Sequence, residues 1–495
     1  MPTSTLPHVV IIGGGFAGTV TAIKLARLAP RPLRLTVIES RDQLGRGIAY
    51  STRNTAHVVN GPAKNFSLYP EQPEHLANWL QHHAARDAWR PPPGVPYPDS
   101  FPPRHLYGDY VQSELESALS EARHPITFKH VTDRALDLEA AAGGQWGIRL
   151  ASGRLLYADD VVLATGLFPL SLARGDVQID PELIAAGRVI DDIWAPGPAV
   201  PVAQDQDVLV IGTNLSALDA MIHANAQGFR GTFHSVSRRG LLVATRRDVA
   251  PWPAFLDPQA LPQSLRAVLR LARAARKAIA QAGEDWQRLA GSIRPHLPAL
   301  WAQADNTERQ RFIRHLRPYW ELGLHRAAPE SGAWLQSIDA ADRHRKLTGR
   351  ILRVAPAVDG RVTVTWRPRG DAAPQTLHVD RVFNTRGFEF DWRRIDDPLV
   401  RNLVSKGYVT PHDTGFGIAA NPATGQVLPR AGSAARLYAV GHPLRGAAWE
   451  SNAIGEQVAG ATATAQAVAR SWVEDGDNGS AARIRVSLRE EVVLP

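Results

Sequence analysis

The chain has 495 residues, a formal net charge of +8 and no cysteine. Its hydrophobic fraction of 44% and charged fraction of 21% are ordinary for a globular protein, and its length allows two or three domains. Without cysteine it cannot use a redox-active thiol pair, a thiolate-held iron–sulfur cluster or a thiolate zinc site. We assign no metal ligands elsewhere in the sequence.

The positive charge has three readings, which the sequence leaves open. Nucleic-acid binding is one, but the sequence contains no recognisable module for it, so we expect no nucleic-acid partner. Scattered surface arginine is the plain explanation. The third reading is attraction of anionic nucleotides or of an anionic substrate.

The sequence predicts no membrane partner. It has no run of eighteen apolar residues, so no membrane span is expected. The first predicted strand starts by about residue 8, which leaves no room for a secretory signal. We therefore expect a cytoplasmic protein.

A strand followed by a glycine-rich turn opens the chain. Residues 9–12 are apolar, and three glycines follow with the spacing G-x-G-x-x-G before a helix. These glycines allow a tight turn, close approach of a pyrophosphate and close helix–strand packing. The next strand, 33–38, ends in an acid that can accept hydrogen bonds from a ribose 2′-OH. We assign this site to FAD, with predicted contacts at Gly13, Gly15, Phe16, Ala17, Gly18, Glu39 and Ser40.

A second strand and turn, at 208–217, predicts a different nucleotide. Asn214 stands where the middle glycine belongs, and its side chain is expected to crowd the pyrophosphate. The following strand ends in two arginines instead of an acid, which suits the 2′-phosphate of NADPH. The alternative is a solvated basic strand end. The predicted NADPH contacts are Gly212, Thr213, Asn214, Leu215, Ser216, Ser237, Arg238 and Arg239.

The order of the predicted elements indicates an α/β fold with two Rossmann-like, doubly wound dinucleotide-binding domains and a helical insertion. We expect the FAD-binding domain to comprise 1–195 and 386–475, and the NADPH-binding domain 196–260 and 346–385. Residues 196–201 are the predicted linker. Helical periodicity over 261–345 predicts an insertion that caps the substrate region, with a closing helix at 455–470 and a loose tail at 476–495.

Further motifs in collinear order resemble a bacterial family of FAD/NAD(P)-binding proteins related to class B flavin monooxygenases. That family includes urate hydroxylases and amino-acid N-oxygenases. The resemblance covers most of the chain, through the first turn and Glu39 and then the segments 45–50, 57–63, 103–108, 164–166, 237–242 and 441–451. The sequence departs from the family at Asn214, at Phe66-Ser67 and at 384–387.

The resemblance implies the remaining site residues. Contacts to FAD are expected from Arg46, Gly47, Tyr50, Val131, Ala164, Thr165, Gly166, Gly441 and Trp449. Asn60 and Ser67 would contact the flavin ring, or else satisfy ordinary loops. Arg104, Arg445 and Glu450 would contact substrate or nicotinamide, or else form ion pairs that hold the loops. His57, His105 and His442 are candidate acid–base groups, and a structural role is the alternative for each.

These features lead to one favoured function and two rivals. The resemblance implies an NADPH-dependent flavin monooxygenase that forms a C4a-(hydro)peroxyflavin with O₂ and oxygenates a small polar, nitrogen-containing or anionic substrate. The absence of cysteine excludes the disulfide reductases that also combine FAD with NADPH. An electron-transfer reductase and a non-catalytic nucleotide or redox sensor remain as alternatives. The expected partners are a small-molecule substrate and O₂, and the sequence leaves a homo-oligomer open.

Overall fold

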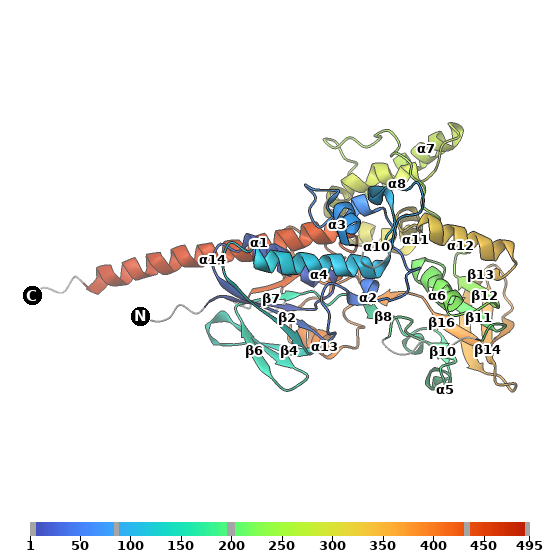
Figure 1. Ribbon diagram of the computed structural model, residues 1–495, viewed down its shortest axis with the longest axis horizontal. Helices are drawn as coiled ribbons and strands as arrows, with labels where there is room; N and C mark the ends of the chain where they lie inside the picture. The colour runs from blue at the N-terminus through green and yellow to red at the C-terminus, as the bar shows by residue number, and fades with distance from the viewer. Residues whose placement is uncertain (1–5, 84–88, 196–202, 430–435, 491–495) are drawn as a thin grey trace, which may run out of the picture.

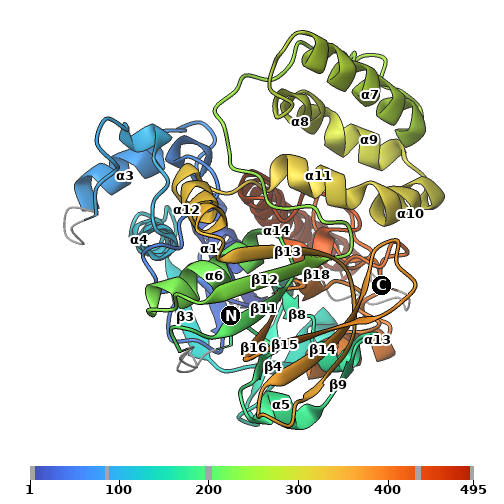
Figure 2. The ribbon, with the colours of Figure 1, turned by 90° about the vertical axis from the view of Figure 1, so that its right-hand side faces the viewer.

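The computed structural model describes residues 6–83, 89–195, 203–429 and 436–490 (Figure 1). The predicted linker at 196–201 and residues 491–495 of the predicted tail lie outside the described residues. Two sheets lie beside each other, with the helical insertion above the second (Figures 1 and 2). Among the described residues, no helix combines the length and the hydrophobicity that a membrane span requires.

The first sheet is built from both ends of the chain. Its strand order in the described residues is β18 (Arg436–Ala439), β7 (Asp160–Leu163), β1 (His8–Ile12), β2 (Leu33–Glu39) and β3 (Ile126–Thr132), and all neighbours are parallel. Parallel strands are usually covered on both faces, and the continuous apolar run of β1 fits this rule.

Alternate residues of β1 enter different cores. Val9 and Ile11 pack with α1 (Phe16–Leu28), α4 (Arg104–Ser120) and α14 (Ile454–Glu490) on one face. Val10 and Ile12 pack on the opposite face with a three-stranded sheet and a short helix. That layer consists of β4 (Ala135–Ala140), β5 (Trp146–Leu150), β6 (Leu155–Ala158) and α13 (Pro398–Ser405). The first turn is therefore held between two packed layers.

The second sheet mixes parallel and antiparallel strands. Its order is β10 (Val189–Ile190), β16 (Arg381–Asn384), β11 (Asp207–Ile211), β12 (Thr232–Ser237), β13 (His344–Pro356), β14 (Val362–Pro368) and β15 (Gln375–Val379), and β9 (Gln178–Ile179) also pairs with β13. Helix α6 (Leu215–Ala226) follows β11 and packs against the same strands, in a core that includes Val208 and Val210.

Short elements connect these layers. The two-stranded antiparallel pairing of β8 (Phe168–Pro169) and β17 (Phe388–Glu389) joins the two segments that cross between the sheets. The remaining short elements are α2 (Gly47–Tyr50), α3 (His75–His83), α5 (Pro181–Ala185), η1 (Ala63–Asn65), η2 (Tyr97–Asp99), η3 (Ala142–Gly144), η4 (Leu172–Arg174), η5 (Arg294–His296) and η6 (His442–Leu444).

The segment between β12 and β13 is helical, and we call its helices α7–α11 the cap. These are α7 (Leu265–Gln281), α8 (Arg288–Ile293), α9 (Leu297–Gln303), α10 (Asn306–His315) and α11 (Arg317–Leu324), and α12 (Pro329–Ala340) returns the chain to the second sheet. Figure 2 shows the cap as a separate layer beyond the edge of the second sheet.

Two details differ from the sequence prediction. Strands β9 and β10 precede residue 195 but pair with the second sheet, so the sheets do not divide the chain at the predicted boundary. Short strands of two residues carry too little periodicity to be assigned from sequence. Helix α14 also continues to Glu490, past the predicted end at Arg470; no proline interrupts the chain between Pro443 and Pro495.

Candidate active site

The first turn has the geometry of a nucleotide site. Gly13 has φ +107°, and a Cβ there would lie 2.2 Å from the carbonyl oxygen of Ala164. A Cβ on Gly18 would lie 1.9 Å from the carbonyl oxygen of Gly13. Gly15 is the N-cap of α1 and provides no side chain to the first N–H groups of that helix. The helix N-terminus is thus open to an anionic group.

Glu39 ends β2 beside this turn. Its carboxylate accepts hydrogen bonds from the N–H of Gly14 at 3.0 Å, from the N–H of Arg41 at 3.0 Å and from the hydroxyl of Ser40 at 3.2 Å. These contacts fix the carboxylate at the strand end while leaving acceptor positions for a ribose. Val131 on β3 is one strand further along, paired with Ile38, and is buried.

The loop after β2 closes against the turn. Gly47 is so close that a Cβ on Gly15 would lie 3.3 Å from the Cα of Gly47. Tyr50 packs on Phe16, with 5.9 Å between the ring centroids. The Arg46 side chain is directed away to α4, where it pairs with Asp109 and donates to the carbonyl of His105. Its Nη atoms therefore brace the loop, while its Nε is buried without a partner among the described residues.

Buried polar atoms without partners gather where the flavin is expected. Ala164 continues the first sheet by donating to Ile12, and Thr165 follows with an unpartnered hydroxyl before Gly166 at φ +70°. After β18, Gly441 has φ +72°. Beyond it, the Trp449 indole nitrogen, the Ser451 hydroxyl and the Asn452 carbonyl oxygen are also buried without a partner in the described part of the chain. Buried polar groups normally have partners, so these residues fit a bound polar cofactor such as FAD.

Two predicted flavin contacts have different surroundings. The Ser67 hydroxyl is used in a local turn, donating to the carbonyls of Tyr69 and Gln72 and accepting from the N–H of Tyr69. This geometry is the ordinary loop role, and it gives the flavin contact no support. The backbone carbonyl of Asn60 accepts a 2.9 Å hydrogen bond from Arg246, which arrives from the segment after β12.

The second turn repeats the first with one change. Gly212 has φ +136°, and a Cβ there would lie 2.6 Å from the carbonyl oxygen of Thr385. Asn214 is the N-cap of α6 with φ −103°, an extended conformation, so it needs no left-handed backbone. Its side-chain oxygen accepts from the N–H of Leu215 at 2.9 Å. The asparagine thus occupies a helix N–H group that Gly15 leaves open in the first turn.

The second turn opens into a cavity of about 1160 Å³ that extends to cap helix α11. Of the predicted NADPH contacts, Gly212, Thr213, Asn214, Ser237, Arg238 and Arg239 line it, whereas Leu215 and Ser216 do not. Nine arginines line this cavity, against two acidic side chains, Asp176 and Glu321: Arg174, Arg238, Arg239, Arg314, Arg317, Arg350, Arg369, Arg386 and Arg394. The cavity is therefore strongly cationic and suited to an anionic ligand.

Several of these arginines have no carboxylate partner. Within the described residues, no ion pair or side-chain hydrogen bond involves Arg238, Arg350 or Arg369. Partial burial lowers the pKa of Arg238, and so do the charges of Arg239 and Arg350. Cations that repel one another in this way are stabilised by a bound polyanion. The sequence motif contained only Arg238 and Arg239; Arg350 comes from β13, and Arg369 follows β14.

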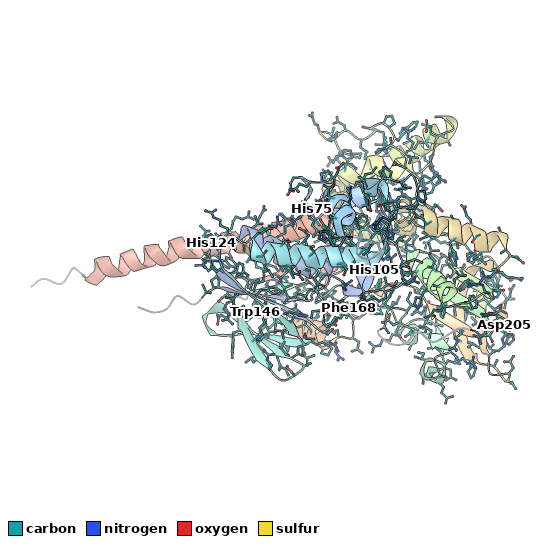
Figure 3. The ribbon with its side chains drawn as sticks, in the orientation of Figure 1. His75, His105, His124, Trp146, Phe168 and Asp205 are labelled. Atoms are coloured by element: carbon teal, nitrogen blue, oxygen red, sulfur yellow. The ribbon has the colours of Figure 1, made fainter. Side chains whose placement is uncertain are left out.

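Arg104 forms an ion pair between the domains. Its guanidinium donates to both carboxylate oxygens of Asp219 on α6, at 2.8 and 3.1 Å, and to the carbonyl of Val58 at 2.9 Å. The alternative of an ion pair that holds the structure is therefore what the geometry shows. His57 lies in the same contact, with Nε2 2.9 Å from the carbonyl oxygen of Asp219. Figure 3 places His105, the neighbour of Arg104, at the end of α4 that faces the second domain.

Arg445 lies on the opposite side of the site, in a buried aromatic cluster formed by Trp301, Phe312, Phe390, Phe416 and Trp449. Its guanidinium lies 4.7 Å from the ring centroid of Phe390 and 4.8 Å from that of Trp449. It donates to Glu321 of α11 at 2.9 Å, and Glu321 also lines the cavity. Glu450 accepts from the indole of Trp320 at 2.8 Å, and burial raises the pKa of its carboxyl. The cluster thus joins the flavin-side loop to the cap.

The buried histidines at this junction are neutral. Burial, assisted by the charge of Arg445, lowers the pKa of His442 to about 3. Burial also lowers the pKa of His325 to about 4, although Glu321 raises it. A histidine with so low a pKa is a poor general base near neutral pH, which weakens the acid–base role proposed for His442. His325 and Glu321 were missed because they belong to segments without a recognisable motif, and Asp219 was missed because its partner Arg104 is 115 residues away in the chain.

Comparison with known proteins agrees with this geometry. Residues 10–168 match a family model described as FAD-NAD(P)-binding. No curated protein matches the chain. Among solved structures, an ornithine N-hydroxylase from Kutzneria sp. 744, in a complex with reduced FAD, NADP⁺ and L-ornithine, is 14% identical with a TM-score of 0.58, over 94% of this chain and 99% of that one.

Two further structures share the fold. The cadaverine monooxygenase of desferrioxamine biosynthesis from Erwinia amylovora, bound to FAD, is 9% identical with a TM-score of 0.60, over 94% of this chain and 95% of that one. Bacillithiol disulfide reductase from Staphylococcus aureus is 14% identical with a TM-score of 0.52, over 94% and 98%. The predicted α/β fold with two dinucleotide-binding domains is confirmed, as is the FAD/NAD(P)-binding character of residues 10–168.

Proposed function

We propose that the protein is an FAD- and NADPH-dependent monooxygenase that oxygenates a small polar, nitrogen-containing substrate. The observation that carries the proposal is the pair of unlike nucleotide turns, the second of which opens into an arginine-lined cavity reaching the cap. The same fold serves both N-hydroxylating monooxygenases and a disulfide reductase. The absence of cysteine favours oxygen chemistry over dithiol chemistry.

The residues divide the work between two nucleotides. Glu39 would accept from the ribose of FAD, and the open N-terminus of α1 would face its pyrophosphate. Arg238 and Arg239, which line the cavity, would hold the 2′-phosphate of NADPH. When bound, FAD supplies acceptance of a hydride from NADPH and activation of O₂.

The cap has the features needed to exclude water. Trp301 of α9 packs on Trp449 at 4.9 Å between ring centroids, and its indole donates to the carbonyl of Gly446 at 2.8 Å. These contacts seal the flavin-side loop against the cap with apolar surface. Exclusion of water strengthens electrostatic interactions in a site and protects reactive oxygen species from side reactions.

The test uses the purified yellow holoenzyme. Anaerobic mixing with NADPH should bleach the flavin, and readmitted O₂ should restore it. A panel of amines, amino acids and purines is then screened for substrate-dependent consumption of NADPH and O₂ with an oxygenated product. Turnover of the substrate at full rate without O₂ would rule out a monooxygenase. Rapid NADPH oxidation with artificial acceptors and no oxygenated product would identify an electron-transfer reductase, and failure of NADPH to bleach the flavin would indicate a nucleotide sensor.

A further inference from the structure

Two side chains of the first domain, Arg104 and His57, converge on Asp219 of the second. Arg104 at the start of α4 contacts Asp219 through both Nη atoms and contacts Val58 through Nε. The guanidinium thereby joins the carboxylate of Asp219 to the strand-like segment that precedes Asn60. The Arg104 and Asp219 side chains are only 13% and 9% exposed, so solvent screens this pair weakly.

His57 adds a second contact to the backbone of the same residue. Its Nε2 lies 2.9 Å from the Asp219 carbonyl oxygen, and its Nδ1 lies 2.8 Å from the Thr52 hydroxyl. Burial lowers the pKa of His57, which favours the neutral ring. A neutral ring with the proton on Nε2 donates to Asp219 and accepts from Thr52, and this assignment satisfies all four groups.

Asp219 belongs to the helix that carries the second nucleotide turn. It lies five residues after the N-cap Asn214, or about 7.5 Å along the axis of α6. A helix of this length moves as one body, so anchoring Asp219 fixes the N–H groups of the turn relative to the first domain. Arg246 ties the next segment of the second domain to Asn60 in the same direction.

The Arg104–Asp219 ion pair is better suited to fixing the relative orientation of the two domains than to increasing the net stability of the fold. The Coulomb attraction in a buried ion pair offsets little more than the desolvation cost of its two charges. A bidentate guanidinium–carboxylate contact, however, allows only one relative orientation of the two groups. Hydride transfer needs that restriction, because displacement of a reacting group by about 1 Å can reduce a rate about 100-fold. No other part of the proposed mechanism uses Asp219.

We infer that Asp219 is a positioning residue that, with Arg104 and His57, sets the distance between the nicotinamide and the flavin. This inference rests on the proposed function, since it requires NADPH to reduce FAD on this chain. Asp219 does not line the cavity of the second turn, so it would act through the placement of α6.

The experiment compares the holoenzyme with its Asp219→Asn variant in anaerobic stopped flow. We expect the limiting rate constant for flavin reduction at saturating NADPH to fall at least about 10-fold. The Kd for NADPH, read from the concentration dependence, should change less than about threefold, and the FAD content should be unchanged. The matched control is Asp207→Asn, which removes an ion pair between Asp207 and Arg361 within the second domain and should leave the rate constant unaltered.

Arg104→Lys provides a second, independent variant, because it keeps the charge and loses the bidentate contact. It should also lower the limiting rate constant for flavin reduction. This variant provides the test if Asp219→Asn does not retain FAD. A wild-type rate constant in FAD-replete variants would overturn the inference, as would a loss of rate that only follows the loss of FAD. If NADPH fails to reduce the wild-type flavin, the proposed function itself is wrong, and that result is visible before any variant is compared.

Discussion

Arg445 and Glu321 connect the loop after β18 to helix α11 of the cap through a 2.9 Å hydrogen bond between Nη2 and Oε1. The side chains are 5% and 16% exposed, and Arg317 donates to the same carboxylate oxygen at 2.9 Å. Although burial opposes it, the charges of Arg317 and Arg445 hold the pKa of Glu321 below its usual value. The carboxylate is thus ionised and shared between the cap and the first domain.

Removing this carboxylate should strongly destabilise the protein. Glu321→Ala leaves the buried Arg445 unpaired, and we expect a loss of about 3–5 kcal/mol in the free energy of unfolding. Urea denaturation followed by tryptophan fluorescence measures the change. The surface pair of Lys64 and Asp99 is the control, since Asp99→Asn should cost less than about 1 kcal/mol. Equal effects of the two substitutions would contradict the role assigned to the buried pair.

Arg238 should determine the choice of coenzyme. Because charge-assisted hydrogen bonds contribute about 1.5–3 kcal/mol, Arg238→Ala should weaken NADPH binding roughly 10- to 150-fold. Binding of NADH, which lacks the 2′-phosphate, should change little. Titration of the oxidised holoenzyme with each coenzyme measures both affinities. Arg353→Ala on the exposed face of β13 serves as the control, and parallel weakening of NADPH and NADH would show that Arg238 does not contact the phosphate.

Replacing Asn214 with glycine should strengthen NADPH binding. The substitution frees the N–H of Leu215 for the pyrophosphate, and one net hydrogen bond of about 0.5–1.5 kcal/mol corresponds to roughly 2- to 12-fold in affinity. Replacing asparagine with glycine at an N-cap should destabilise the helix by only about a few tenths of a kcal/mol. Asn214→Ser retains a capping oxygen and should leave the affinity near the wild-type value. Weaker binding by the glycine variant would show that the asparagine itself contacts the nucleotide.

Glu39 should control retention of FAD. Glu39→Ala removes the acceptor for the ribose and for the N–H of Gly14, so FAD affinity should fall roughly 10- to 100-fold, given about 1.5–3 kcal/mol per charged hydrogen bond. The ratio of flavin absorbance to protein after gel filtration reports the loss. Glu121→Ala, at an exposed position beyond the end of α4, should retain full FAD content.

Stability should decrease in mildly acidic solution. The folded-state pKa values of His442 and His325, about 3 and about 4, lie below those of the unfolded chain. Their contribution is therefore complete above pH about 6.5 and is lost as the pH falls, by up to about 1.4 kcal/mol per pH unit for each histidine. Urea midpoints at pH 7.5 and 5.5 test this expectation.

A histidine variant separates this effect from other titrations. Arg445 faces His442, whereas Glu321, Arg445, Arg294 and Arg317 all face His325. The raised pKa of Glu450 titrates in the opposite sense, so total stability alone is ambiguous. The His325→Gln variant should show a shallower dependence on pH than the wild type. Identical slopes for the two proteins would mean that His325 binds as many protons in the folded as in the unfolded state, so that burial does not lower its pKa.

Local steric requirements were readable from the sequence. The first turn needs Gly13 and Gly18 because a Cβ at either position would overlap a backbone carbonyl. The two glycines are only five residues apart, so the requirement appears as a local sequence motif. The same holds for Gly212 in the second turn. Arg238 was identified because it follows the strand that such a turn specifies.

Contacts between segments far apart in the chain could not be predicted from the sequence. Arg104 and Asp219 are 115 residues apart, and nothing in either segment marks the other as its partner. Arg350 and Arg369 enter the cavity only because β13 and β14 follow β12 in the sheet. The two roles left open for Ser67, a flavin contact or a loop, could not be separated from its residue type, and its hydroxyl bonds the turn that follows it.

The strand order of the first sheet has a consequence for synthesis of the protein. β18 pairs with β7, and α14 packs against α1, so the first domain is assembled from segments at opposite ends of the chain. The second sheet uses only residues between β9 and β16, which are contiguous. On a ribosome, the second sheet can therefore close while the first still lacks an edge strand. The loop after β18, which we propose contacts the flavin, forms only once β18 and the start of α14 have emerged, so we expect cofactor loading to be among the last events of biogenesis.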